Sequence, residues 1–102
     1  MKTLYVRTTL TVPGAGTAIH IAEMQEISDT SCSMQRIIAL APDDSIAGAA
    51  TPHASVGNAD IPQQVVPHPN TYDEFPDIEA EFVSTLEFHS LWTEATALYG
   101  EI

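Results

Sequence analysis

The chain has 102 residues, the length of one small domain, and 44% of them are hydrophobic, which supplies a core and argues against a disordered chain. Its single cysteine, Cys32, excludes an internal disulfide and cannot hold a metal alone. Fourteen acidic residues against three basic ones give a net charge of −11. Such a charge disfavours binding to nucleic acid or to an anionic membrane and favours a basic partner, although acidity that only aids solubility is an equal alternative.

Features of targeting and membrane insertion are missing from the sequence. No apolar run approaches the roughly 20 residues that cross a bilayer. The N-terminal segment alternates apolar and polar residues, unlike the continuous apolar stretch of a secretory signal. With its lone cysteine, the chain fits a reducing compartment, and we expect a cytoplasmic protein with no membrane partner.

The N-terminal third of the chain predicts two strands. Residues 4–12 alternate with a period of two and are rich in threonine and β-branched residues. Residues 18–27 place Ile19 and Ile21 on one face, and the step to Met24 indicates a possible bulge. The "PGAG" between the two segments predicts a turn.

Two further strands are predicted before a change in composition. Residues 33–41 are mostly apolar, as in a central strand, and "PDDS" at 42–45 is typical of a tight turn. Residues 46–50 predict a short returning strand. Residues 51–70 hold four of the seven prolines and show little periodicity, so we expect a long irregular loop there.

The C-terminal third predicts a strand and then a helix. Residues 78–82, "IEAEF", alternate cleanly, with the two glutamates on one face. Ser84 is a candidate N-cap, Glu87 stands three residues later as in a capping box, and Gly100 fits a C-terminal cap. Between these caps, apolar residues follow at helical spacing: Phe88, Leu91, Trp92, Ala95, Leu98 and Tyr99.

These elements predict an α+β fold in one domain, residues 1–102. We expect an antiparallel sheet of four to five strands with the C-terminal amphipathic helix packed on one face. The opposite face of such a sheet would be open to water. That open face is where we expect a binding surface.

Enzymatic chemistry has little support in the sequence. The four histidines, at 20, 53, 68 and 89, match no zinc-binding spacing, and no G-x-S-x-G elbow or phosphate-binding loop is present. Glu79 and Glu81 would lie about 7 Å apart on a strand, a spacing that glycosidases use but that acidic chains produce by chance. We expect no catalytic residues, no metal site and no cofactor.

The strongest local signal is a cluster of five carboxylates within nine residues, interleaved with the aromatic residues Tyr72 and Phe75. Its acids are Asp73, Glu74, Asp77, Glu79 and Glu81. One interpretation is an edge strand whose charges prevent aggregation. The other is a surface that docks on a basic partner, with Tyr72 and Phe75 as anchors. Glu23 and Glu26 form a second acidic patch that we place on the same open face.

Two stretches, "DTSCSMQRIIALAPDDSIAGAA" and "NTYDEFPDIEAEFVSTLEFHSLW", resemble a family of small acidic bacterial domains of uncharacterised function. The resemblance covers roughly residues 20–96. Its members are similar to the immunity proteins of polymorphic toxin and contact-dependent inhibition systems, which bind a toxin domain, often a nuclease, and block its active site. The matching positions are Arg36, Asp43, Asp44, Glu79, Glu81, Ser84, Glu87, Phe88 and Trp92.

The resemblance and the charge together predict an immunity protein. It would neutralise a cognate toxin, a basic nuclease, by covering the active site with an acidic surface, without binding nucleic acid itself. Two alternatives stay open. One is a phage-encoded inhibitor of a defence nuclease, and the other is a small-molecule binding module or enzyme that uses the open sheet face, the 51–70 loop, His53 and His68.

Overall fold

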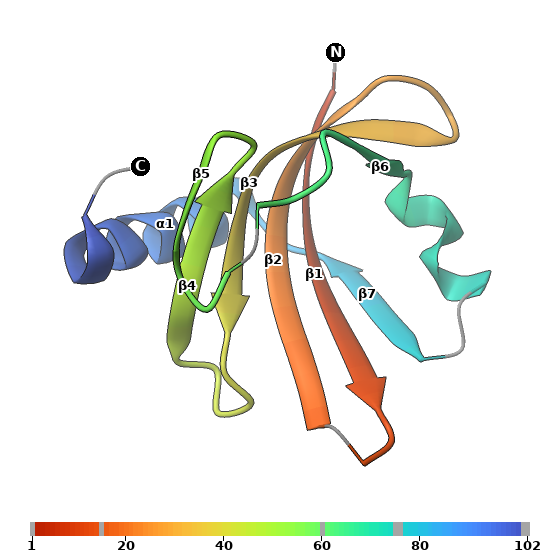
Figure 1. The fold of residues 1–102 in the computed structure, drawn as a ribbon. Coiled ribbons are helices and arrows are strands. Elements are labelled where there is room, and N and C mark those ends of the chain that lie inside the picture. The colour runs from red at the N-terminus through yellow and green to blue at the C-terminus, as the bar shows by residue number, and fades with distance from the viewer. Residues whose placement is uncertain (1, 15, 60, 75–76, 101–102) are drawn as a thin grey trace.

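In the computed structural model, which describes residues 2–14, 16–59, 61–74 and 77–100, an antiparallel sheet is followed by a C-terminal helix (Figure 1). The α+β class is therefore confirmed. The elements in chain order are β1 (Thr3–Val12), β2 (Gly16–Glu26), β3 (Ser31–Leu40), β4 (Ile46–Thr51), β5 (Ala54–Gly57), β6 (Val65–Pro67), the 3-10 helix η1 (Pro69–Glu74), β7 (Ile78–Phe82) and α1 (Thr85–Tyr99).

The predicted number of strands is wrong, because the described residues form a sheet of seven. The two unexpected strands, β5 and β6, lie within residues 51–70, which the sequence predicts as an irregular loop. They have four and three residues, too short to show a period of two in a proline-rich stretch. β5 is defined by pairing with β4, the strand that directly precedes it, and β6 by pairing with the distant first residues of β3.

Strand β3 is the centre of the sheet and changes its partner along its length. The strand order is β5-β4-β3-β2-β1-β7, and β6 pairs with β3 outside this path. The first residues of β3, Ser31–Ser33, pair with β6, whereas residues 37–40 pair with β4. β7 pairs with β1 and thereby forms one edge of the sheet.

A bulge in β3 changes which residues share a face. Opposite β2, Glu23 pairs with Arg36 and the next residue, Met24, pairs with Met34, so Gln35 is an extra residue on β3. The bulge predicted within residues 18–27 is thus found at this step, but its extra residue lies on the neighbouring strand. Because of this insertion, Met34 and Ile37 pack in the same cluster although three positions separate them.

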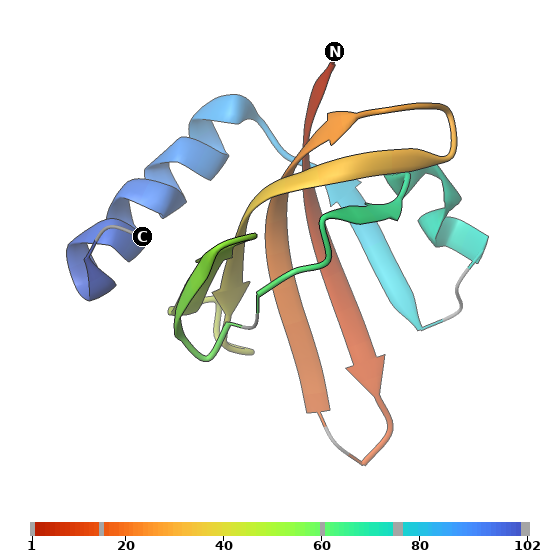
Figure 2. The same cartoon turned by 45° about the horizontal axis from the view of Figure 1, so that its top comes forward.

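Both faces of the sheet are covered, so the predicted open face is wrong. On one face, α1 covers a cluster that contains Ile19, Ile21, Ile38, Leu40 and Phe88. On the other face, β6 and η1 cover a second cluster, to which they contribute Val66 and Tyr72; its buried members are Leu4, Val6, Ala22, Met24, Cys32 and Met34. In Figure 1, α1 lies behind the sheet and the segment leading into β6 passes in front of it, and Figure 2 shows both from above.

The helix begins and ends as predicted. The Ser84 hydroxyl accepts a hydrogen bond from the Glu87 amide at 3.0 Å, and Gly100, with φ of 87°, donates its amide to the Thr96 carbonyl. Of the predicted apolar stripe, only Phe88 and Ala95 are buried. Among the described helices, none combines the length and the apolar character needed to span a bilayer.

The close approach of β4 and β5 predicts an effect of a single methyl group at Gly48. A Cβ atom there would lie 2.5 Å from the Val56 carbonyl oxygen and 2.7 Å from the amide nitrogens of Asn58 and Ala59. Because these are backbone atoms, they cannot move aside individually. We expect Gly48→Ala to lower the free energy of unfolding by more than about 2 kcal/mol.

The control is Gly14→Ala, where nothing lies within 4 Å of the added Cβ and only the positive φ of 79° is unfavourable. That strain costs about 1 kcal/mol. Urea unfolding followed by circular dichroism measures both losses. Equal losses would show that the β4–β5 contact is looser than described.

Candidate functional site

Four exposed acids lie where η1 ends and β7 forms the edge of the sheet, whereas other exposed acids, such as Asp29, Glu87 and Glu94, lie elsewhere. We call this group the acidic edge, and its members, all exposed, are Glu74, Asp77, Glu79 and Glu81. Two residues predicted to belong to it, the side chain of Asp73 and the whole of Phe75, lie outside the described part of the structure. The structure therefore brings together four of the seven residues predicted around β7.

The alternation of β7 places its two glutamates beside β1. Glu81 pairs in register with Arg7, and Glu79 pairs with Thr9. The Arg7 Nε atom lies 4.0 Å from the Glu81 carboxylate, but the same guanidinium donates a much shorter hydrogen bond, 2.7 Å, to Asp44. These side chains, with Ala80, line a hollow of about 320 Å³. Arg7 compensates Glu81 only weakly, because Asp44 is its main partner.

The remaining acids of the edge are not compensated inside the chain. Within the described residues, the carboxylates of Glu74, Asp77 and Glu79 accept no hydrogen bond and form no ion pair; Asp77 is held only by its backbone carbonyl, which accepts from the Thr11 amide. Mutual repulsion of these charges is unrelieved. A cation from outside the chain would relieve it.

Tyr72, predicted as an exposed anchor for the partner, has a structural role in the fold. Its ring packs against the cluster that holds Leu4, Met24 and Met34. Its hydroxyl donates to the Pro67 carbonyl at 3.0 Å, and burial raises the pKa of Tyr72. The half-buried aromatic ring therefore fixes η1 to the sheet, and its contact with a partner stays a prediction.

Glu23, predicted to be in the second acidic patch, is paired inside the molecule. Arg36 donates to both of its carboxylate oxygens, at 2.7 and 2.8 Å, and the Tyr5 hydroxyl donates at 3.1 Å. The guanidinium lies 5.0 Å from the ring centre of Phe88 and 4.9 Å from that of Trp92. The hydrogen bonds from Arg36 hold the pKa of Glu23 below its ordinary value. The Glu23 side chain is only 13% exposed, so it is unsuited to contact a partner.

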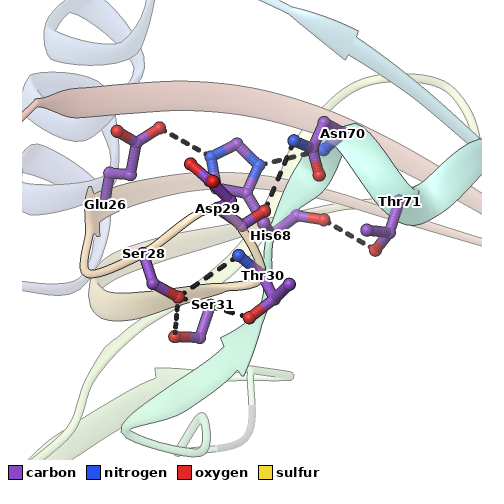
Figure 3. A network of polar contacts seen from close by, with 8 residues as sticks. All are labelled: Glu26, Ser28, Asp29, Thr30, Ser31, His68, Asn70 and Thr71. Carbon is purple, nitrogen blue, oxygen red and sulfur yellow. Dashed lines mark hydrogen bonds and ion pairs between the residues drawn. The ribbon is translucent and has the colours of Figure 1, made fainter.

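Glu26 lies on the opposite face from Glu23 and binds His68, so the predicted second patch does not exist. Figure 3 shows its carboxylate directed at the His68 ring, with Nε2 and Oε2 2.7 Å apart. The Asn70 amide donates to the other ring nitrogen, Nδ1, at 3.1 Å. The ring is therefore a neutral tautomer that carries its proton on Nε2 and donates it to Glu26.

The same arrangement argues against Ser–His–Glu catalysis, although the hydroxyls of Ser28, Thr30, Ser31 and Thr71 lie around His68 (Figure 3). Both ring nitrogens are already engaged, so neither can take a proton from Ser28 or Ser31. Those hydroxyls bond within the turn between β2 and β3, while the His68 amide donates to the Thr30 carbonyl and the Thr71 hydroxyl donates to the His68 carbonyl (Figure 3). These contacts attach the β6–η1 segment to that turn.

Other candidate chemistry is not assembled by the fold. His53 is exposed between β4 and β5, far from the engaged His68, so the two histidines do not form the small-molecule pocket considered from the sequence. In the part of the chain that the structure describes, no three His, Cys, Asp or Glu side chains are arranged to hold a metal. Cys32 is buried, and its burial raises the pKa of its thiol, which disfavours the reactive thiolate.

Sequence reasoning did not identify Arg7 as part of the site. It occupies a polar position of the alternating segment 4–12, and its partners Asp44 and Glu81 lie 37 and 74 positions away along the chain. Its position in the alternating segment was a usable signal, because the residue that follows the buried Val6 has to face the other side of the sheet. No local sequence pattern indicated that Asp44 and Glu81 would be its partners.

Loss of the cation in the Arg36–Glu23 pair should destabilise the protein strongly. Arg36→Met keeps an unbranched chain against Phe88 and Trp92 but leaves the Glu23 carboxylate covered and unpaired. We expect a loss of about 3 kcal/mol in the free energy of unfolding. In the control Arg7→Met, the partner Asp44 is 61% exposed, so a loss of at most about 1 kcal/mol is expected. Similar losses in urea unfolding of the two variants would contradict this ranking.

The lowered pKa of Glu23 also predicts a pH dependence. The charged groups around Glu23 are Arg36, Tyr5 and His89. Because folding lowers the pKa of Glu23 from its ordinary 4.5, its contribution to stability is complete above pH 4.5 and is lost as the pH falls through the folded-state pKa. The stability difference between the native protein and Glu23→Gln should therefore shrink below pH 4.5 in urea titrations. A stability difference between the two proteins that stays constant from pH 7 to pH 3 would refute this pH dependence.

Comparison with known proteins identifies no family for this chain. Models of protein families, curated proteins and solved structures were each searched, and none matches. The resemblance to immunity proteins thus stays a prediction from the sequence. A function has to be argued from the contacts, the exposure and the charges of this chain itself.

Proposed function

We propose that the protein binds a basic partner protein through its acidic edge, and that it acts as an immunity protein that neutralises a toxin domain, a nuclease, by occluding its active site. One observation carries the proposal. Other acids of the sheet, such as Glu23, Glu26 and Asp44, are bound to Arg36, His68 and Arg7, whereas those of the acidic edge stay exposed and essentially uncompensated.

The distribution of the few cations supports this proposal. The chain has three basic residues, and its two arginines are both bound to carboxylates within the fold. Among the described residues, the cation that reaches the acidic edge is Arg7, which lies 4.0 Å from Glu81 and is bound more closely to Asp44. A partner with clustered Lys and Arg supplies the compensating charge, and the complementary fields raise the rate of encounter.

A nuclease fits this description better than a neutral enzyme. Its substrate-binding cleft has to be positive to hold phosphates. Carboxylates spaced along an edge can occupy the positions of successive phosphates and compete directly with the substrate. The same geometry gives inhibition without any catalytic residue on this chain, in agreement with the role that the resemblance implies.

The competing explanation is that the charges of β7 only protect an edge strand from pairing with a second copy. The two explanations differ in what removal of the charges should do. Protection alone predicts that neutral variants self-associate and that no partner is affected. Docking predicts that a partner loses affinity and that this affinity depends on salt.

The first experiment is identification of the partner. We expect the protein to co-purify with the product of the gene adjacent to its own, and to inhibit nucleic-acid cleavage by that product. Co-purification with a host defence nuclease in its place would support the phage-inhibitor alternative. Failure to inhibit a co-purified nuclease would refute occlusion of its active site.

Charge reversal tests the assignment of the acidic edge. In Glu74→Lys/Glu79→Lys, we expect the affinity for the nuclease to fall at least about tenfold at low salt, with a weaker salt dependence. The matched control, Asp29→Lys/Glu94→Lys, changes the net charge by the same amount at exposed positions away from β7. Isothermal titration calorimetry at two salt concentrations measures both. Equal losses would show that net charge, and not the acidic edge, determines binding.

A further inference from the structure

The outer side of β7 presents backbone groups with no strand to pair with. The Val83 amide donates to the Tyr5 carbonyl, and the Thr11 amide donates to the Asp77 carbonyl. Since hydrogen-bonded positions alternate in an antiparallel pair, the odd-numbered residues of β7 direct their N–H and C=O groups toward β1. The even-numbered residues, Ile78, Ala80 and Phe82, direct theirs outward.

η1 packs beside β7, but most residues of the strand are exposed. In the described residues, β7 pairs with β1 alone, and no backbone hydrogen bond from another segment reaches Ile78, Ala80 or Phe82. Ala80 is exposed, and Phe82 is 63% exposed. In Figure 1, β7 is the last strand of the sheet on the side away from α1 and β5. An extended segment could therefore add to the sheet here.

The side chains of β7 define what such a segment must carry. Glu79 and Glu81 project on one face and Ala80 and Phe82 on the other, because successive side chains of a strand alternate. A strand paired with β7 places every second side chain beside the glutamates and the others beside the apolar pair. Lys or Arg alternating with apolar residues matches both faces.

Charge argues against a second copy of this chain as the occupant. Pairing of two β7 strands would bring Glu79 and Glu81 of both copies onto neighbouring positions, and like charges across a strand pair are destabilising. The opposite edge of the sheet, β5, has four residues and no charged one. In the described residues, the short strands β5 and β6 carry no charged side chain, so β7 is the edge that combines free backbone groups with a charge that selects the partner.

We propose that the β7 edge binds an extended basic segment of the partner protein as an added strand, with its Lys or Arg side chains on Glu79 and Glu81. This inference rests on the proposed function and specifies how the toxin is held. Backbone hydrogen bonds supply affinity, and the alternating charges set the register and the choice of partner. The segment would lie beside the active site that the acidic edge covers.

The probe is a synthetic seven-residue peptide in which Lys alternates with Val. Its control has the same sequence, N-methylated at two neighbouring central residues, so that it keeps the charge but loses one N–H donor on each edge and carries a methyl group that blocks strand pairing there. Fluorescence anisotropy at low salt should show at least tenfold weaker binding of the methylated peptide. In amide hydrogen exchange, the Ala80 and Phe82 amides should slow at least tenfold with the first peptide, while those of Glu79 and Glu81 stay unchanged.

A variant of the protein provides a second test. Ala80→Pro removes an outward N–H without touching the hydrogen bonds to β1, a position where an edge strand tolerates proline. If the variant keeps its circular dichroism spectrum, peptide binding should weaken at least tenfold. A folded variant with unchanged affinity would overturn the proposal; if the variant unfolds, the methylated peptide decides.

The outcomes separate this inference from the function on which it rests. Equal affinity for both peptides, or unchanged exchange at Ala80 and Phe82, would overturn strand addition and leave docking by charge alone. If neither peptide binds, strand addition is likewise overturned, while inhibition of the co-purified nuclease still tests the function. Binding of the first peptide that is insensitive to Glu74→Lys/Glu79→Lys would support the backbone contacts and contradict the role of the acidic edge.

Discussion

The docking of α1 on the sheet depends on the ion pair between Arg36 and Glu23. The helix buries only two of its own residues, Phe88 and Ala95, so apolar burial alone would hold it weakly. Phe88 and Trp92 stack on the Arg36 guanidinium, which Glu23 fixes from the neighbouring strand. A cation against aromatic rings is favourable when it is desolvated, but a covered charge requires a partner of opposite sign. One arginine thus connects β2, β3 and the helix.

The bulge at Gln35 makes this arrangement compatible with a second core. Without the extra residue, the side chains of β3 on one side of it would point to the opposite face of the sheet. With it, Met34 and Ile37 face the β6–η1 segment, while Arg36 faces α1. Burial of apolar side chains on both faces leaves no flat open surface. Any docking surface is consequently displaced to an edge of the sheet.

The burial of both sheet faces also affects where the charged side chains lie. Both arginines are used to compensate carboxylates within the fold, and Glu26 is bound by His68, which attaches the β6–η1 segment to the β2–β3 turn. Four of the exposed acids are left at the end of η1 and on β7. The acids of β7 repel a second copy of the same chain from the free backbone edge, and they make this edge suited to a basic partner chain. In the proposed docking, protection of the edge and selection of a partner are two effects of the same side chains.

The sequence by itself determined what depends on neighbouring residues: the caps at Ser84 and Gly100, the alternation of β1 and β7, and the exposure of Glu79 and Glu81. Their signals are local, because capping and alternation need only a few consecutive residues. Only the tertiary structure decided that β5 and β6 are strands, that Tyr72 packs inward, and that Glu23 and Glu26 are paired on opposite faces. The partners of β6, Glu23 and Glu26 are distant in the chain, whereas β5 follows its partner β4 directly but is too short to show a pattern of its own. The edge position of β7, and with it the outward direction of the Ala80 and Phe82 backbone, belongs to this second group, since an edge exists only where a neighbouring strand is missing.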